Sequence, residues 1–365
     1  MKILKSVLKI FIFSFILLSC SSDDIDTRTI EITPDTKFEN GFFVSAEGRF
    51  GNNDGSISFI NEDLSSTTNF AYNKVNGVQL GGLIQSVAFN GENAYIILND
   101  VNTIVVIDRQ TFKKKAVVTS KLKNPRYMTF SGGKGYITNW GDGNVETDDY
   151  VAVLNLETNK IENETISLAN GVEQIISKDN KLFVTHKGGF TSNNIVSVVD
   201  LSANNKVEEI IVKDNPDELF FTDNGNLVVL SEGKPEFDDD FNLIGRSTSA
   251  ISIIDLNIGF EVELELDFPE NENASLMSYE NGKIYYYSNN KVFEIPDTAT
   301  ELAANEQGIE VGNIYGMNVI NNTLYTVSFA FTTFSEFKAI DIETKSTKFS
   351  SSVGLGSSKI YFSKN

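Results

Sequence analysis

Aromatic side chains gather in the longest predicted loops of this 365-residue chain, where turn formation does not require them. Aromatic walls that surround a few fixed polar groups are the chemistry of a small-ligand or partner site. Some of these rings are expected instead to fold back and cover the strands beneath them. The loop aromatics are Phe50, Trp140, Phe190, Phe237, Phe241, Phe329, Phe331 and Phe334, and Arg49, Arg126, Tyr127, His186 and Arg246 are the polar side chains expected among them.

A second set of polar side chains occupies matching positions in repeated strand segments. Aligning these segments on their last large residue defines two levels, which we expect near the axis of a ring. Polar groups there orient a ligand or merely hold water. The first level contains Gln85, Arg126, Val172, Asp217 and Ser275, and the second contains Ser86, Tyr127, Glu173, Glu218 and Leu276. Combining both sets, the predicted ligand-binding residues are Arg126, Tyr127, Trp140, His186, Phe190, Asp217, Glu218, Phe237, Phe241, Phe331 and Phe334.

Signals for metal binding and catalysis are weak. The chain has one histidine, His186, and one cysteine, Cys20, which is too few for a zinc cluster. The alternation over residues 142–148 resembles a calcium loop, but Thr147 stands where an EF-hand has its turn glycine. The acidic run at residues 238–240 is a similar, weaker candidate. We therefore predict no catalytic residues, no resident metal and no cofactor, with calcium as the remaining possibility, although a carboxylate enzyme is left open.

The elements that position these side chains recur along the chain. Strand segments of similar composition repeat about every 47 residues between Phe43 and Tyr325, a spacing typical of a repeated supersecondary unit. Most repeats combine an entry segment, a short Asn- or Gly-containing turn, and an anchor strand that leads into a variable loop. β-Branched partner strands follow, ending at Asp108, Asn155, Asp200, Asp255 and Asp341.

The count of these segments predicts an all-β, seven-bladed β-propeller with four-stranded blades. The first anchor strand, at Phe43, has no entry segment before it, whereas Lys359 to Ser363 has no anchor strand after it. Pairing the two would close the ring and leave no free sheet edge. We assign residues 41–365 to this propeller.

The first residues have the pattern of an export signal. Lys2, Lys5 and Lys9 precede an apolar run that is too short to span a bilayer, and Leu17-Leu18-Ser19-Cys20 follows. This ending resembles a bacterial lipoprotein box, in which cleavage before the cysteine is followed by acylation of its thiol. An ordinary signal peptide with an incidental cysteine is the alternative. We assign residues 1–19 to the signal, and residues 20–40 to the lipidated cysteine and a flexible tether.

The charge of the chain excludes some partners. Its 30 basic and 50 acidic residues give a net charge of −20, and cleavage of the signal would remove three lysines. Such a chain lacks the basic footprint that nucleic acids and anionic lipids require. The acidic run after Cys20 resembles a surface-export signal of Gram-negative lipoproteins, although any soluble tether is polar. We expect attachment to the outer membrane through lipid alone, with the domain facing the cell exterior.

The strand sequences resemble the YVTN-repeat family of bacterial surface propellers. The matching segments are Pro125-Arg126-Tyr127, Gly135 to Asn139, and the Val-x-Val-Ile/Val-Asp strands that end at Asp108 and Asp200. Gly41 to Gly48, followed by Asn76 to Gly81, is similar to a lipoprotein branch of that family that includes vitamin B12-capturing propellers. The strand around Tyr285-Tyr286-Tyr287 departs from the usual pattern. The resemblance implies capture of a nutrient and its transfer to a TonB-dependent transporter.

These observations together favour a non-enzymatic lipoprotein that binds a small nutrient on its loop face, with a corrinoid as the leading candidate. One alternative is an interaction or structural module that docks on an outer-membrane partner without binding a small molecule. Another is a propeller hydrolase or lyase. Polar groups that converge at the axis favour capture, whereas a flat apolar patch would favour docking.

Overall fold

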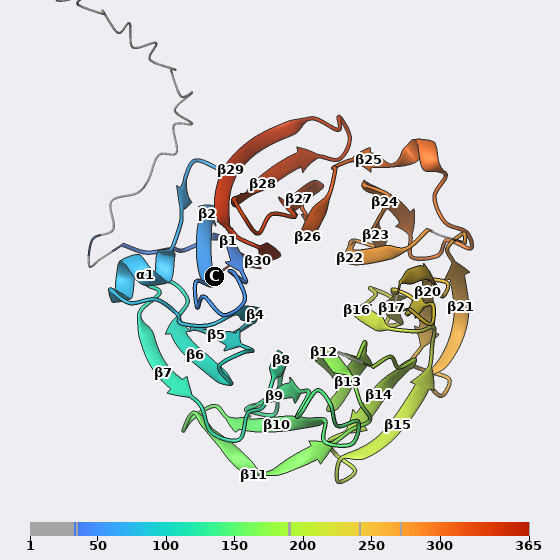
Figure 1. Ribbon diagram of the computed structural model, residues 1–365, viewed down its shortest axis with the longest axis horizontal. Helices are drawn as coiled ribbons and strands as arrows, with labels where there is room; N and C mark the ends of the chain where they lie inside the picture. Colours follow the sequence, from blue (N-terminus) through green and yellow to red (C-terminus); the bar gives the residue numbers. More distant parts are fainter. Residues whose placement is uncertain (1–32, 34–35, 189–190, 241, 271, 365) are drawn as a thin grey trace, which may run out of the picture.

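Seven antiparallel sheets surround a central axis, as Figure 1 shows for the computed structural model. The structure describes residue 33 and residues 36–188, 191–240, 242–270 and 272–364. Each sheet contains four strands and forms one blade, which confirms the predicted seven-bladed β-propeller. Within those residues, no helix is long and apolar enough to cross a membrane.

The first four blades run in chain order around the ring. Blade 1 has β1 (Gly41–Ala46), β2 (Ser56–Asn61), β3 (Thr67–Thr68) and β30 (Ser357–Ser363), followed by helix α1 (Ala71–Asn76). Blade 2 has β4 (Ile84–Asn90), β5 (Asn93–Leu98), β6 (Thr103–Asp108) and β7 (Lys114–Val118). Blade 3 has β8 (Pro125–Ser131), β9 (Lys134–Asn139), β10 (Tyr150–Asn155) and β11 (Lys160–Ser167). Blade 4 has β12 (Val172–Lys178), β13 (Lys181–His186), β14 (Ile195–Asp200) and β15 (Lys206–Ile211).

The last three blades depart from this regular plan at two places. Blade 5 has β16 (Pro216–Phe221), β17 (Leu227–Ser231), β20 (Ala250–Asp255) and β21 (Glu261–Asp267), with a separate hairpin of β18 (Pro235–Phe237) and β19 (Leu243–Arg246). Blade 6 has β22 (Ala274–Glu280), β23 (Lys283–Ser288), β24 (Lys291–Pro296), the 3-10 turn η1 (Asn305–Gln307) and the two-residue β25 (Ile309–Glu310). Blade 7 has β26 (Ile314–Ile320), β27 (Thr323–Ser328), β28 (Phe334–Asp341) and β29 (Thr347–Leu355).

The C-terminal strand closes the ring, as the sequence predicts. β30 pairs antiparallel with β1, from Gly41 opposite Ser363 to Ala46 opposite Ser357. It supplies the innermost strand of a blade whose other strands come from the N-terminal part of the chain. Closure of this kind leaves no sheet edge at the chain ends free to pair with another molecule.

The hydrophobic core is divided into layers between neighbouring blades. Seven clusters of buried apolar residues are found among the described residues, and each joins side chains of adjacent blades. The layer between blades 1 and 2 is rich in aromatic rings, with Phe43 stacked on Phe112 at 4.6 Å between ring centroids. Phe38 packs edge-on against the same Phe112 ring and is 1% exposed. The packed domain therefore begins before the predicted tether ends at residue 40.

The short turns between entry and anchor strands have the predicted hairpin chemistry. Asp179 and Asn180, and likewise Asn321 and Asn322, adopt positive φ angles between consecutive strands. Two-residue hairpins of this kind match the twist of the flanking strands, and Asn and Asp tolerate the left-handed region better than most residues. The longer loops that follow the anchor strands emerge at the opposite edge of the disc. The variable loops that follow the anchor strands therefore lie on one face.

Candidate functional site

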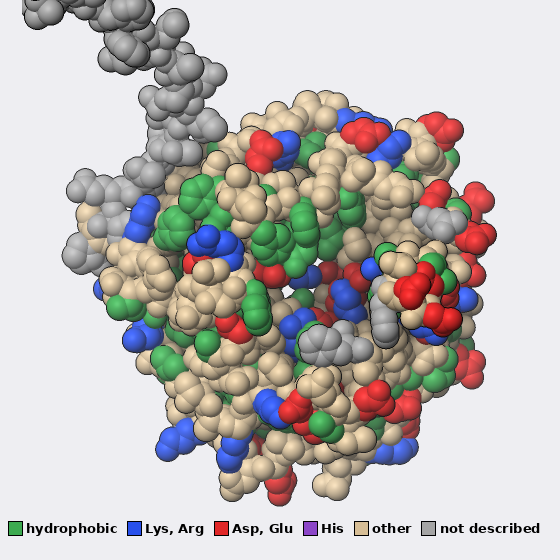
Figure 2. Space-filling view, viewed as in Figure 1, with side chains coloured by type: hydrophobic (Ala, Val, Ile, Leu, Met, Phe, Trp, Pro, Cys, Tyr) green, Lys and Arg blue, Asp and Glu red, His purple; other side chains and the backbone are tan. Residues whose placement is uncertain are grey.

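A cavity opens at the centre of the loop face and has a volume of about 530 Å³. Figure 2 shows a hollow at the axis with charged side chains inside it and apolar side chains along part of its rim. Residues from most of the blades contribute to this axial pocket. Its walls are formed by Glu47, Phe50, Leu83, Gln85, Asn99, Arg126, Tyr127, Glu173, Lys187, Asp217, Glu232, Ser275, Leu276, Ile314, Tyr315, Ser358 and Lys359.

A repeated irregularity of the innermost strands directs side chains toward the axis. In blades 2 to 7, the register between the first and second strands shifts at the loop-face end, as between Pro125 and Met128. Arg126 and Tyr127 lie within that shift in blade 3, and Asp217 and Glu218 lie within the equivalent shift in blade 5. β-Bulges re-aim side chains beside functional sites. Because the bulge recurs in successive blades, polar side chains form a ring around the pocket.

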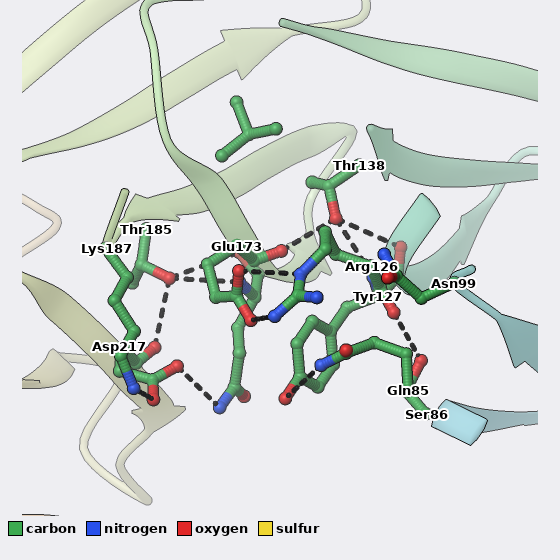
Figure 3. Close-up of polar contacts among 12 residues, drawn as sticks. Gln85, Ser86, Asn99, Arg126, Tyr127, Thr138, Glu173, Thr185, Lys187 and Asp217 are labelled. Carbon is green, nitrogen blue, oxygen red and sulfur yellow. Dashed lines mark hydrogen bonds and ion pairs between the residues drawn. The ribbon is translucent and has the colours of Figure 1, made fainter. Parts of the chain in front are cut away.

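Threonines of the anchor strands hold these bulges in place. Thr138 accepts a hydrogen bond from the Tyr127 N–H at 3.0 Å and donates to the Glu173 carbonyl of the next blade at 2.7 Å. Thr185 makes an equivalent donation to the Asp217 carbonyl at 3.0 Å. Figure 3 shows these bonds linking neighbouring blades behind the pocket wall. These bonds fix the backbone around the pocket.

Arg126 and Glu173 form the most enclosed ion pair of the pocket. Arg126 donates from Nε to Glu173 Oε2 at 2.9 Å and from Nη2 to Oε1 at 2.7 Å, and the two side chains are 13% and 3% exposed. The guanidinium also lies over the Trp140 ring, 3.7 Å from its centroid. Burial disfavours the charge on Arg126, but Glu173 outweighs that effect and raises the pKa of the guanidinium. The arginine is consequently fixed in one orientation.

Lys187 joins two carboxyl groups on the blade 5 side of the pocket. Its Nζ lies 2.7 Å from Asp217 Oδ2 and 3.0 Å from Glu232 Oε2. Burial would raise the pKa of Asp217, yet Lys187 and Lys359 together lower it. Burial raises the pKa of Glu232 to about 7, against the opposing attraction of Lys187. The two acids that contact Lys187 are thus shifted in opposite directions, with the pKa of Asp217 lowered and the pKa of Glu232 raised.

Two further contacts complete the polar lining. Lys359 of the closing strand donates to Glu218 Oε1 at 2.8 Å. The Tyr315 hydroxyl donates to Glu47 Oε2 at 3.3 Å, and burial raises the pKa of Glu47. Arg126, Lys187 and Lys359 are thus each bonded to an acid of the protein. The pocket presents fixed hydrogen-bonding groups and little uncompensated charge.

An aromatic cluster stands at the rim beside blade 7. It consists of Tyr315, Phe329 and Phe331, whose ring centroids lie 5.1 to 5.4 Å apart in edge-on contacts. Phe329 is 51% exposed, and Phe50, which also lines the pocket, is 85% exposed. Rings of this kind offer apolar surface directly beside the polar interior of the pocket.

The structure brings together only part of the predicted site. Arg126, Tyr127 and Asp217 line the axial pocket, and Glu218 contacts it through Lys359. Trp140 supports the Arg126 guanidinium from behind, and Phe331 belongs to the rim cluster. Like Glu218, Trp140 and Phe331, three more predicted residues are absent from the lining: His186, Phe237 and Phe334. Two others, Phe190 and Phe241, fall outside the described residues.

His186, Phe237 and Phe334 have environments of their own. His186 is fully buried between strands, with Nδ1 3.0 Å from the Asn170 carbonyl oxygen and Nε2 2.9 Å from Ser197 Oγ. Phe237 is 53% exposed on the β18–β19 hairpin. Phe334 is 52% exposed and packs edge-on against Phe70. His186 therefore has a structural environment, and the two phenylalanines offer surface away from the pocket.

Several lining residues escaped the sequence prediction, although the sequence contains a signal for them. Glu47, Lys187 and Glu232 each follow directly after an anchor strand, at the first position of the loop. Extending the strand alignment to the C-terminal segment would also have placed Ser358 and Lys359 at the two axial levels. The residue after the anchor strand thus lines the pocket in four blades, as Glu47, Asn99, Lys187 and Glu232.

The calcium candidates have other partners in the structure. Asp142 pairs with Lys123 at 3.4 Å, and the same ammonium lies 3.8 Å from Asp148. Asp238 accepts hydrogen bonds from the backbone N–H groups of Asp240 and Asn242 in an exposed turn. Over the described ranges, no group of three or more His, Cys, Asp or Glu side chains is arranged to hold a metal ion.

The fold and pocket define a seven-bladed β-propeller with a polar axial pocket on its loop face. The chain belongs to the family described as domain of unknown function DUF5074, which matches residues 40–234. No curated protein matches the sequence.

Solved structures of similar fold include enzymes of unrelated sequence. The periplasmic gluconolactonase of Pseudomonas aeruginosa is 12% identical with a TM-score of 0.63, over 89% of this chain and 99% of that chain. A putative 6-phosphogluconolactonase from Bacteroides fragilis is 11% identical with a TM-score of 0.63, over 91% and 99%. Hydrazine synthase from Kuenenia stuttgartiensis is 14% identical with a TM-score of 0.60, over 77% and 92%. At such identities the similarity extends to the fold alone.

Proposed function

We propose that this chain is a non-enzymatic binding lipoprotein that captures a small nutrient in the axial pocket and passes it to a TonB-dependent outer-membrane transporter. The observation that carries the proposal is the ring of fixed polar groups at the axis beside an exposed aromatic cluster. A corrinoid is the leading candidate ligand, because the chain resembles the vitamin B12-capturing branch of the YVTN-type propellers. Preformed concave sites with few polar groups are typical of small-molecule binding.

The pairing of charges inside the pocket favours a ligand without net charge there. An anion would have to displace Glu173 from Arg126, or Asp217 from Lys187, and leave a buried carboxylate unpaired. A neutral ligand rich in amide or hydroxyl groups can instead bond to groups that are still available. Within the described part of the chain Arg126 bonds to Glu173 through Nε and Nη2, which leaves Nη1 for an acceptor on a ligand.

The rim aromatics supply the apolar half of the proposed site. Phe329 and Phe50 are exposed next to the pocket and offer ring surface to a flat or hydrocarbon part of the ligand. A ligand that covers them removes apolar area from water, worth about 25 cal/mol per Å². The exposed rings beyond the pocket, Phe334 and Phe237, are suited to contact the transporter during transfer.

Anchoring through Cys20 belongs to the same proposal, although Cys20 lies outside the described residues. A lipid at this position would hold the propeller at the outer membrane, with residues 21–37 as spacer. Protease treatment of intact cells tests surface display, and a Cys20→Ala chain tests the anchor. A domain fully protected from protease would contradict display, and a Cys20→Ala chain that remains in the membrane would contradict lipid attachment.

Titration calorimetry with cyanocobalamin tests capture directly. We expect binding by the wild-type protein and at least a tenfold loss of affinity for Phe329→Ala. Phe334→Ala is the matched control, because its ring is equally exposed but does not contact the rim cluster. Arg126→Gln should also weaken binding. Absence of binding to cyanocobalamin and to other surface-acquired nutrients, together with co-purification of a transporter, would favour a docking module instead.

Lactone hydrolysis is a second candidate function, favoured by one feature of the pocket. Glu232 has a pKa of about 7 beside Lys187, which is the property of a general base near neutral pH. The similarity of the fold to a gluconolactonase and to a putative 6-phosphogluconolactonase makes a sugar lactone the first substrate to assay. Hydrolysis of glucono-δ-lactone that disappears in Glu232→Gln would support this function over capture. Equal rates for both proteins would exclude Glu232 as the base.

A further inference from the structure

A second cavity lies on the outer side of the disc, where blade 6 lacks most of its fourth strand. β25 contains two residues and pairs only with Lys291 and Val292 of β24. The segment 297–308 occupies the remaining space and encloses a cavity of about 520 Å³ together with β21 of blade 5. β21, β24 and β25 lie at the right and upper right of Figure 1. The volume falls within the range of small-molecule sites.

Aromatic side chains form the inner wall of this outer cavity. Tyr286 stacks on Phe293 with ring centroids 5.2 Å apart, and Phe268 meets Tyr286 edge-on at 5.3 Å. The Tyr286 hydroxyl accepts a hydrogen bond from the Ala303 N–H at 3.1 Å, which fastens the segment 297–308 to the blade. Tyr286 belongs to the triple-tyrosine strand that departs from the usual repeat. The strand that departs from the repeat in sequence therefore belongs to the blade whose fourth strand is only two residues long.

Ser288 places an unsatisfied polar group in the same wall. The residue is 3% exposed, lines the cavity, and its Oγ has no hydrogen-bond partner in the part of the chain that the structure describes. A buried hydroxyl without a partner destabilises the state in which it is left unpaired. A polar group of a ligand that reaches the inner end of the cavity would supply the missing bond.

The charged residues that line the outer cavity are all acidic. Its lining residues include carboxylates but no lysine or arginine. Lys213 neutralises two of them, Glu265 at 3.1 Å and Asp267 at 3.4 Å. Among the described residues no ion pair is formed by the other two, Glu272 and Glu301. Carboxylates beside aromatic walls are the chemistry that recognises an organic ammonium group.

From this combination we propose that blade 6 carries a second ligand site, which binds a small organic amine with an aromatic or hydrocarbon body. The body packs against Tyr286, Phe293 and Phe268, and the ammonium group lies toward Glu272 and Glu301. The site does not depend on the axial pocket, because the two cavities share no lining residue.

Three compounds of one shape and different charge test the proposal. Tyramine carries an ammonium group, tyrosol is neutral, and 4-hydroxyphenylacetate is an anion. Calorimetry with the purified protein should show binding of tyramine, at least fivefold weaker binding of tyrosol, and no binding of 4-hydroxyphenylacetate. High salt should weaken tyramine binding and leave tyrosol binding nearly unchanged. Equal binding of all three compounds, or no binding of tyramine at millimolar concentration, would overturn the proposal.

Substitutions locate the bound amine. Glu272→Gln and Glu301→Gln should each weaken tyramine binding at least threefold, whereas Glu270→Gln, an exposed acid outside the cavity, should not change it. Ala303→Phe should block the cavity and abolish binding, with an unchanged melting temperature as the check on folding. Tyramine binding that survives Ala303→Phe in a folded protein would place the amine elsewhere. Cyanocobalamin binding by Arg126→Gln tests the axial pocket alone, because Arg126 does not line the outer cavity.

Discussion

Arg126 of blade 3 and Glu173 of blade 4 form a bidentate ion pair across the blade boundary, with N–O distances of 2.9 and 2.7 Å. The two residues are 47 positions apart, which is one repeat of the propeller. The pair therefore joins neighbouring copies of the repeat at the wall of the axial pocket. It fixes the guanidinium for a ligand and also holds the two blades together.

Removal of one partner from this pair should destabilise the protein strongly. Arg126→Met leaves Glu173 as an unpaired carboxylate that is 3% exposed, so we expect a loss of about 3–5 kcal/mol in urea unfolding. The double variant Arg126→Met/Glu173→Met should recover much of the loss. Lys206→Met breaks an exposed pair with Glu208 and should leave the unfolding midpoint nearly unchanged. A single variant as stable as this control would contradict the structural role.

Glu232 should make stability depend on pH between about 4.5 and 7. Its pKa rises from an ordinary 4.5 to about 7 in the folded protein, so the folded state retains a proton that the unfolded state loses. The contribution of this group to stability is complete below pH 4.5 and is lost as pH rises through 7. The urea midpoint of the wild type should therefore fall relative to that of Glu232→Gln as pH rises from 4.5 to 7, and a constant difference between the two midpoints would contradict the shift. Glu236→Gln, on the exposed hairpin, should follow the wild-type profile.

The sequence was sufficient to predict the scaffold because the fold is a repeat. The same apolar strands recur, so the number of blades follows from counting, and the unmatched segments at the two ends identify the closing pair. The axial level of Arg126 and Asp217 was predictable for a related reason. An alignment on one buried residue fixes the level of every other residue on that strand.

The remaining part of the site was not predictable from periodicity. The directions of Phe237 and Phe334 depend on loop conformations, which no repeat determines. The partner of Lys187 depends on the β-bulge in blade 5, and bulges cannot be read from the hydrophobic pattern. His186 was predicted as the first polar residue of a variable loop, yet it is the last residue of β13 and is fully buried. A boundary error of one residue at a strand end thus changes a predicted pocket residue into a core residue.

His186 should remain neutral well below the usual range for histidine. Burial lowers its pKa from 6.5 to about 4, against hydrogen bonding to the backbone around Asn170. Because it is the only histidine, one ring signal in a proton NMR titration reports on it alone. We expect no inflection between pH 8 and 5, and stability from this group that is lost as pH falls from 6.5 toward 4. An inflection near pH 6.5 would show that the ring is accessible.

Deletion of the closing strand should destroy cooperative folding. Removal of residues 357–365 takes away the six pairings of β30 with β1 and the ion pair between Lys359 and Glu218. It also removes Tyr361, whose hydroxyl accepts a hydrogen bond from the Val87 N–H at 3.1 Å. A domain stabilised by about 5–15 kcal/mol does not tolerate the loss of an inner strand and the exposure of two apolar layers.

Thermal unfolding followed by circular dichroism measures this effect. The shortened chain should lose its sharp transition or show a midpoint at least 15 °C lower, with increased binding of a hydrophobic dye. The matched control removes only residues 364–365, which follow β30 and leave every pairing of that strand intact. Lys359→Met removes the ion pair with Glu218 but keeps the pairing of β30 with β1. This variant should therefore retain a cooperative transition. If the shortened chain melted like the control, the closing strand would not be what holds blade 1 in the ring.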